Sequence, residues 1–127
     1  MTLRSFIYSL FILHLHAVSS GLLAQDAPPI ERVKIEALIS HIEGLEGAKF
    51  IRNGSDYDSK TAAKFLRGKW QAHQKAIKTA ADFIAIAATR SSTSGKPYMI
   101  RLKDSTEVPC ADYLTSRLKK ISETKDK

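Results

Sequence analysis

A serine-rich loop in the second half of the chain has the residues best suited to holding phosphate. Backbone amides of a glycine-containing loop, together with a lysine, can surround an anion. Pro97 occupies the position where a nucleotide-binding loop has the hydroxyl that holds magnesium, and Arg90 that of its first glycine. The sequence therefore argues against nucleotide hydrolysis. A looser anion site stays open beside a purely structural loop, and its candidate residues are Ser92, Ser94, Gly95 and Lys96.

A second group of polar residues could form one pocket with this loop. An arginine that follows a strand and another on a helix can converge on a ligand through charge-assisted hydrogen bonds. The candidate residues are Arg52, Asn53, Tyr57, Arg67 and Tyr98. The alternative is structural, with Arg52 bound to carbonyl groups at a helix end or to the carboxylate of Asp56.

Other chemical motifs are weaker. Ser116 and Lys119 have the Ser-x-x-Lys spacing of some acyl-transfer enzymes, but the companion motifs are absent. His41 and His73 are the histidines that follow residue 24, and spacing gives neither a nucleophile nor an orienting partner. We expect His73 to pack in the core beside Trp70. No cluster of Cys and His offers the ligands of a metal site, so we expect neither a metal nor a cofactor.

A line of basic residues follows one side of the helix predicted over residues 58–78. The line has no acidic partner one turn away inside that helix, so its charges repel one another. A solvated helix face is one explanation, and an anionic partner is the other. The residues of this basic line are Lys60, Lys64, Arg67, Gln71, Lys75 and Lys78.

Hydrophobic periodicity and turn residues predict an α+β fold. About four helices pack on a small antiparallel sheet of two or three short strands, preceded by an N-terminal signal peptide. Asn53-Gly54 predicts a tight turn, and Thr79 with Asp82 resembles a capping box. The helices are expected over 30–45, 58–78, 79–87 and 111–121, and the strands over 49–52, 98–102 and 107–108.

Residues 25–127 are predicted to form one small domain, with a loose leader over 25–29 and a frayed tail over 122–127. Cys110 is the single cysteine, so an intramolecular disulfide is excluded. We interpret it as a small buried residue near a helix start, with a reactive thiol as the alternative.

The first 24 residues have the three parts of a signal peptide: a positive charge at Arg4, an apolar stretch over 5–18, and small residues before Gln25. Cleavage is expected after Ala24, with Ser20 or Gly21 as alternatives, and an uncleaved anchoring segment stays open. Without Arg4 the chain has 19 basic and 13 acidic residues, a net charge of about +6. A cationic domain outside the cytoplasm meets anionic envelope material, and nucleic acid is a less expected partner.

The run Phe50-Ile51-Arg52-Asn53-Gly54 and the later Ser94-Gly95-Lys96-Pro97-Tyr98 resemble motifs of the YfeK-like family of small secreted bacterial proteins. The resemblance covers about residues 35–101, with the motifs in the same order. Phe65 departs from the pattern, since the family often has a polar residue there. The resemblance implies a bacterial, periplasmic protein and adds no reaction, because the family is one of unknown function.

These observations favour a non-enzymatic periplasmic module that binds an anionic envelope component or a protein partner. The alternative is a small periplasmic hydrolase or transferase whose site combines Arg52, Arg67 and the loop from Ser92 to Tyr98. A homo-oligomer is a third hypothesis. No transmembrane segment is expected after residue 24, because the chain beyond it has no sufficiently long apolar run.

Overall fold

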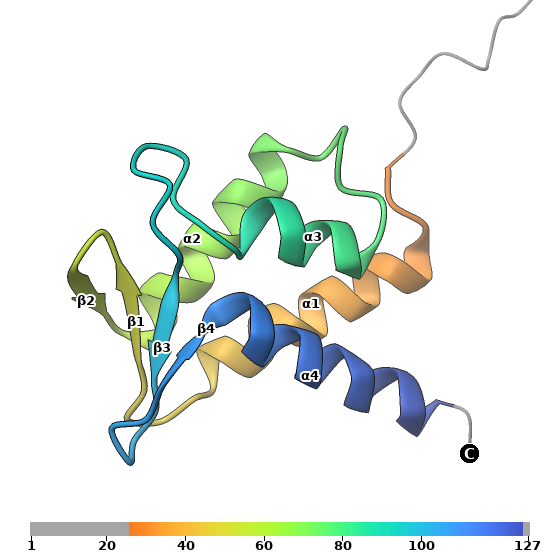
Figure 1. The fold of residues 1–127 in the computed structure, drawn as a ribbon. Coiled ribbons are helices and arrows are strands. Elements are labelled where there is room, and N and C mark those ends of the chain that lie inside the picture. Colours follow the sequence, from red (N-terminus) through yellow and green to blue (C-terminus); the bar gives the residue numbers. More distant parts are fainter. Residues whose placement is uncertain (1–25, 126–127) are drawn as a thin grey trace, which may run out of the picture.

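The computed structural model describes residues 26–125. Its α+β architecture places the strands at one side of the molecule and the helices at the other (Figure 1). The helices are α1 (Pro29–Glu43), α2 (Ser59–Ala72), α3 (Ala80–Ala87) and α4 (Cys110–Thr124). The strands are β1 (Lys49–Arg52), β2 (Ser55–Tyr57), β3 (Met99–Arg101) and β4 (Glu107–Pro109). The predicted signal peptide, residues 1–24, lies outside the described residues.

The sheet is antiparallel and has four strands in the order β2-β1-β3-β4, so the prediction of two or three strands was wrong. The unpredicted strand is β2, which pairs with β1 through the register Phe50↔Tyr57. Asn53 and Gly54 have φ angles of 52° and 78°, which suit a two-residue hairpin turn. The sequence of β2, Ser-Asp-Tyr, has no apolar alternation because it is an edge strand with an exposed Asp56.

One core lies between the helices and the sheet. Helix α1 contributes an apolar stripe at helical spacing, and the sheet contributes aromatic and aliphatic side chains from β1, β3 and the residue before β3. Cys110 and Leu114 of α4 are fully buried against them, which confirms the interpretation of Cys110. The large core side chains include Ile35, Leu38, Ile39, Ile42, Phe50, Leu66, Phe83, Tyr98 and Ile100.

Helix α2 ends at Ala72, six residues before its predicted end at Lys78. His73 has the non-helical angles φ −117° and ψ 23° and is exposed, so the prediction that it packs in the core was wrong. The helical wheel does not apply beyond Ala72, and the chain folds back instead. Ile77 is still fully buried, because this connection returns to the core before α3.

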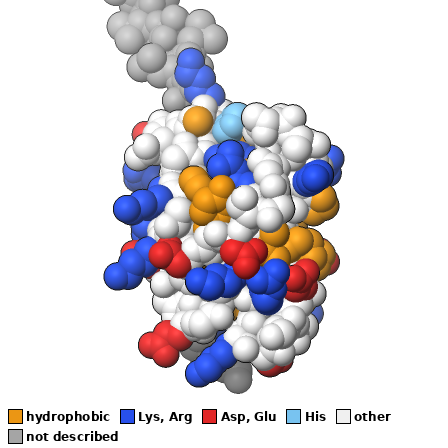
Figure 2. Space-filling view, turned by 90° about the vertical axis from the view of Figure 1, so that its left-hand side faces the viewer, with side chains coloured by type: hydrophobic (Ala, Val, Ile, Leu, Met, Phe, Trp, Pro, Cys, Tyr) orange, Lys and Arg blue, Asp and Glu red, His pale blue; other side chains and the backbone are white. Residues whose placement is uncertain are grey.

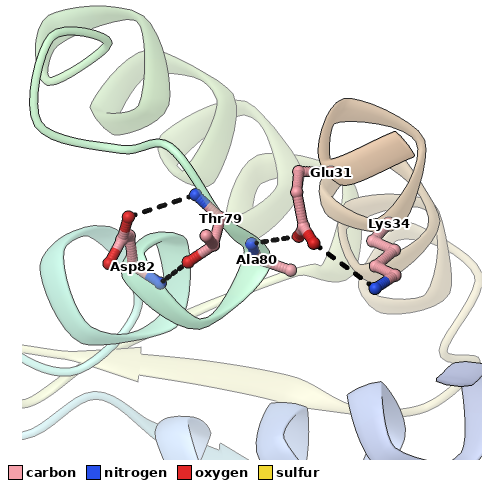
Figure 3. A network of polar contacts seen from close by, with 5 residues as sticks. All are labelled: Glu31, Lys34, Thr79, Ala80 and Asp82. Atoms are coloured by element: carbon pink, nitrogen blue, oxygen red, sulfur yellow. Dashed lines mark hydrogen bonds and ion pairs between the residues drawn. The ribbon is translucent and has the colours of Figure 1, made fainter. Parts of the chain in front are cut away.

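The start of α3 is fixed by two sets of polar contacts (Figure 3). Thr79 and Asp82 form the predicted capping box, in which the Thr79 hydroxyl accepts from the Asp82 amide at 3.0 Å. The Glu31 carboxylate on α1 accepts from the Ala80 amide at 2.8 Å and lies 3.4 Å from the Lys34 ammonium. The carboxylate therefore joins α1 to the positive end of the α3 dipole.

The outer helices differ from their predicted ranges, and α1 begins one residue earlier than expected but ends at Glu43, two residues before the predicted end. Pro29 begins α1 because proline suits the first helical position, and Ala27 before it is buried. In the same way α4 runs from Cys110 to Thr124, beyond the predicted range of 111–121. Of the predicted leader and tail, residues 25, 126 and 127 lie outside the described part of the chain.

Candidate functional site

The serine-rich loop lies beside the β1–β2 turn, because the Ser94 hydroxyl donates to the side-chain oxygen of Asn53 (Figure 1). The loop uses its own amides: the Gly95 amide donates to the Ser91 carbonyl at 2.9 Å, and the Lys96 amide donates to the Ser94 hydroxyl at 3.2 Å. Ser92, Ser94, Gly95 and Lys96 are exposed. The amides that a phosphate site would need at Gly95 and Lys96 are therefore engaged within the loop.

Tyr98 does not line an open pocket. It is only 3% exposed, and its ring packs 5.2 Å from that of Phe50. The Lys69 ammonium donates to the Tyr98 hydroxyl at 3.2 Å and to the Arg90 carbonyl at 3.0 Å. These bonds connect α2 to the residues at the two ends of the loop, so Lys69 and Tyr98 have a structural role in holding the loop in place.

Arg52 packs on an aromatic side chain rather than on a helix end or on Asp56. Its guanidinium carbon lies 4.8 Å from the centre of the Phe65 ring, a cation–π distance. Tyr57 meets the same ring edge-on at 5.0 Å. Phe65 thus joins β1 and β2 to α2. Asp56 pairs instead with Arg101 at 2.6 Å.

Arg67 lies on a different side of α2. It is two residues from Phe65 and from Lys69, so its side chain leaves the helix about 200° away from theirs. It faces α1, where its guanidinium lies 3.5 Å from Glu36 and 3.3 Å from Glu43. The structure therefore brings Asn53 together with Ser94, and Arg52 with Tyr57, but it separates Arg67 from both pairs.

The basic line is not a continuous helix face. Lys60 and Lys64 are exposed on α2, whereas Lys75 and Lys78 follow the end of that helix. The Lys78 amide also donates to the Asp82 carboxylate at 3.0 Å. Figure 2 shows the side of the molecule that carries β2, where Lys and Arg side chains are interspersed with Asp and Glu. The predicted uncompensated stripe is thus broken by the helix end and by the acidic partners of Arg67.

A cavity of about 300 Å³ lies between α1, β4 and α4, and we call it the α1–α4 pocket. Within it the His41 Nε2 atom and the Tyr113 hydroxyl are 2.7 Å apart and share a hydrogen bond. The two rings stack with their centres 5.7 Å apart. The lining residues are His41, Val108, Asp112, Tyr113, Ser116, Arg117 and Lys120.

Arg117 is the least compensated charge of this pocket. Its Nε atom is enclosed and has no hydrogen-bond acceptor among residues 26–125. In the same part of the chain no carboxylate lies within 4 Å of its guanidinium, although Asp112 lines the pocket. A buried donor without an acceptor is uncommon in folded proteins and calls for an explanation.

Burial and the positive charges of the pocket shift the pKa values of its titratable groups. Burial lowers the pKa of His41, and the positive charges of Arg117 and Lys120 lower it further. Burial also raises the pKa of the Tyr113 hydroxyl, with Arg117 acting in the opposite direction. The pocket therefore favours a neutral imidazole and a neutral phenol beside the positive charges of Arg117 and Lys120. Asp112 is the one carboxylate among the lining residues, so the cations of the lining outnumber it and favour an anion.

A second cavity, of about 250 Å³, lies between the segment before α1 and helices α1 and α2. Trp70, Gln71 and Gln74 contribute to its walls, together with Arg32 and Arg67. Arg67 is already paired there with Glu36, a residue that also lines the cavity. We assign the α1–α4 pocket as the candidate site because, among the described residues, the buried side-chain donor without an acceptor belongs to its Arg117 and not to an arginine of the second cavity.

In the sequence, His41 was considered only as an isolated histidine. The candidate site residues predicted there did not include Tyr113, Arg117 or Lys120. The available signal was helical spacing, since positions 113, 117 and 120 share one side of α4. That spacing does not reveal the partner helix, because His41 and Tyr113 are 72 residues apart.

Within residues 26–125, no group of three or more His, Cys, Asp or Glu side chains is arranged to hold a metal ion. None of the helices in that range has the length and apolar character needed to span a bilayer.

Comparison with known proteins identifies the family. A sequence model described as "Family of unknown function (DUF5329)" matches residues 29–122. The chain is 34% identical over 68 residues to the uncharacterized protein YfeK of Salmonella typhimurium strain LT2, which is 54% of this chain and 57% of that protein. The chain thus matches less than two thirds of the length of that relative, and no solved structure matches it. The expected kinship with YfeK-like proteins is confirmed, and the chain belongs to the family of unknown function DUF5329.

Proposed function

We propose that this protein is an exported binding module that holds an anionic group of an envelope component in the α1–α4 pocket. The observation that carries the proposal is Arg117, whose enclosed Nε atom lacks an acceptor and whose guanidinium lacks a carboxylate among residues 26–125. A phosphate or carboxylate ligand in the pocket supplies the missing counter-charge to the guanidinium. Charge-assisted hydrogen bonds of this kind are about twice as strong as those between neutral groups.

The surroundings of Arg117 support an anion in particular. Lys120 adds a second cation to the lining and Ser116 adds a hydroxyl donor, and with the single carboxylate of Asp112 the lining keeps one positive charge in excess. Tyr113 keeps its proton because burial raises its pKa, so its hydroxyl can donate to a ligand or to His41. These groups lie on successive turns of a rigid helix, which fixes their spacing before the ligand binds.

Binding without chemistry is the function we favour. The alternative enzyme required Arg52, Arg67 and the loop from Ser92 to Tyr98 to act together. Arg67 is bound to Glu36 and Glu43 on the other side of α2, and Arg52 is stacked on Phe65. These contacts give both arginines structural roles, which supports a binding module over that enzyme.

The binding proposal is tested by calorimetric titration with inorganic pyrophosphate at low and high salt. Lys120→Gln removes a cation that lines the pocket, and Lys119→Gln removes an exposed neighbour that does not line it. We expect saturable binding by the wild type, about three- to tenfold weaker binding by Lys120→Gln, and little change for Lys119→Gln. Equal losses for the two variants would show that net charge alone attracts the anion, and would refute the pocket.

The proposed export rests on the signal-peptide features of residues 1–24. Mass spectrometry of the protein isolated from bacterial cells that express the full gene tests it directly. We expect a mature chain that begins at Gln25 and is found in the periplasmic fraction. An intact Met1 in the cytoplasmic fraction would refute export, and with it the envelope as the source of the ligand.

A further inference from the structure

Two large apolar side chains of the described chain are conspicuously exposed, and both belong to α1. Ile30 is 48% exposed and Val33 is 57% exposed, whereas the core-facing residues of the same helix are almost fully buried. An isolated exposed apolar residue is ordinary. Here the two are three residues apart, so they are neighbours on one face of the helix.

This apolar face leads to the α1–α4 pocket. Val33, Ala37 and His41 follow one another at intervals of four residues, which places them along one side of α1. About 12 Å of helix separates Val33 from His41, given the rise of an α-helix. Ile30 lies near the same line, seven residues before Ala37. Apolar side chains therefore extend from the cationic pocket toward the N-terminal end of α1.

Helix α4 crosses α1. His41 near the end of α1 contacts Tyr113 near the start of α4, and Figure 1 shows the two helices running in opposite directions and crossing. The N-terminal end of α1 and the C-terminal end of α4 lie toward the same side of the molecule and diverge from the crossing. Lys120 belongs to the C-terminal half of α4 and lines the pocket together with His41.

The charges of this face are unevenly compensated. Lys34 lies 3.4 Å from Glu31 and is paired. Among residues 26–125, neither Arg117 nor Lys120 has a carboxylate within 4 Å. The result is a surface with two cations without a carboxylate partner at the pocket and two exposed aliphatic side chains farther along α1. An anionic surface with an apolar interior is complementary to both parts.

We propose that the α1–α4 face docks on an anionic phospholipid membrane, with a lipid phosphate in the α1–α4 pocket. This inference rests on the proposed function and names its ligand class. Ile30 and Val33 insert at the boundary between headgroups and acyl chains, as apolar residues of interfacial helices do. Arg117 and Lys120 bind the phosphate layer, where each basic residue adds to the attraction. A soluble anion would use the pocket and leave the apolar face without a role.

The test is co-sedimentation with vesicles of phosphatidylglycerol and phosphatidylcholine, compared with phosphatidylcholine alone. The variants are Ile30→Ser with Val33→Ser, Lys120→Gln, and Lys119→Gln as the charge-matched control. All proteins have the same N-terminus, so residues before 26 contribute equally. Because Ile30 and Val33 are exposed, their replacement should leave the melting temperature almost unchanged.

We expect selective binding to the anionic vesicles. The partition coefficient should fall about tenfold for the double serine variant and about fivefold for Lys120→Gln. Lys119→Gln should bind close to the wild type, and the double serine variant should keep its affinity for pyrophosphate. Vesicle binding that the serine substitutions do not change would refute the inference. So would pyrophosphate binding without vesicle binding, although that result would leave the proposed anion site intact.

Discussion

Replacing Arg117 with methionine should separate two effects of the candidate site, its cost in folding stability and its contribution to anion binding. The Nε atom of Arg117 is enclosed without an acceptor in the described chain, whereas the side chain as a whole is only partly buried. Methionine keeps an unbranched apolar stem that ends in a methyl group where arginine has Nε, and it removes the polar head. We expect the variant to be more stable than the wild type and unable to bind pyrophosphate.

The size of the gain follows from the burial of a single donor. A buried donor without a partner costs about 1–3 kcal/mol. The lower end applies because one nitrogen of the guanidinium, Nε, is enclosed without an acceptor and the side chain as a whole is only partly buried. Loss of the repulsion from the neighbouring Lys120 adds little at a partly exposed site. A gain of about 1 kcal/mol corresponds to roughly 4 °C or more in the melting temperature of a domain this small.

Thermal unfolding followed by Trp70 fluorescence measures this change, since Trp70 is the one tryptophan of the chain. Arg67→Met is the matched control, because Arg67 is 38% exposed and pairs with Glu36 and Glu43. The control should lose about 0–1 kcal/mol. The two substitutions should therefore shift the melting temperature in opposite directions. A loss of stability in Arg117→Met would show that its guanidinium has a structural partner, and the argument for an unneutralised site would fail.

Three other measurements test the structure. The pKa of His41 is lowered below its ordinary value of 6.5, chiefly by burial, so the folded protein binds fewer protons than the unfolded chain just below that pH. The free energy of unfolding in urea should therefore decrease as the pH falls through that range, and His41→Gln should reduce the decrease; an unchanged slope would contradict it. Burial raises the pKa of Cys110 to about 12, so thiol reagents should label it slowly at about pH 8 unless urea is added; fast labelling of the folded protein would show that the thiol is open. Glu31→Ala removes the acceptor of the Ala80 amide and should cost about 1–2 kcal/mol in urea unfolding. Lys34→Ala, which removes the partly exposed ion pair with Glu31, should cost less, and equal costs would assign the stability to that pair instead.

Local chemistry made part of the fold predictable from the sequence. Asn53 and Gly54 accept positive φ at low cost, and they form the predicted turn. Thr79 and Asp82 satisfy amides within one helical turn, and their capping box is confirmed. The periodicity of α1 predicted its buried residues because the core is on one side of that helix. Each of these predictions depends on residues a few positions apart.

The wrong predictions depended on contacts across the chain. Strand β2 is held by pairing with β1 and by the bond from Asp56 to Arg101, and neither is visible in a run of three polar and aromatic residues. Helix α2 ends at Ala72 although helical periodicity continues, and Ile77 is buried from the connection that follows the helix. The spacing of apolar residues indicates which side chains are buried. It does not show which backbone conformation buries them.

The candidate site was hidden for a related reason. The predicted site was chosen by residue types that are often functional, at Arg52, Asn53, Tyr57 and Tyr98. In the structure these side chains join β1, β2, α2 and the loop. The α1–α4 pocket combines a histidine from the first helix with an arginine from the last. Only the packing of α1 on α4 brings them together, and helical spacing within one element does not predict its partner.

The central claim is that the α1–α4 pocket, rather than the net positive charge, binds the anion. Backbone amide NMR spectra recorded during a pyrophosphate titration test it residue by residue. We predict saturable shifts concentrated at His41, Tyr113, Arg117 and Lys120, with little change at Lys60 and Lys64 on α2, and their loss in Arg117→Met. Weak shifts spread over every basic region of the surface, unaltered by that substitution, would contradict the account.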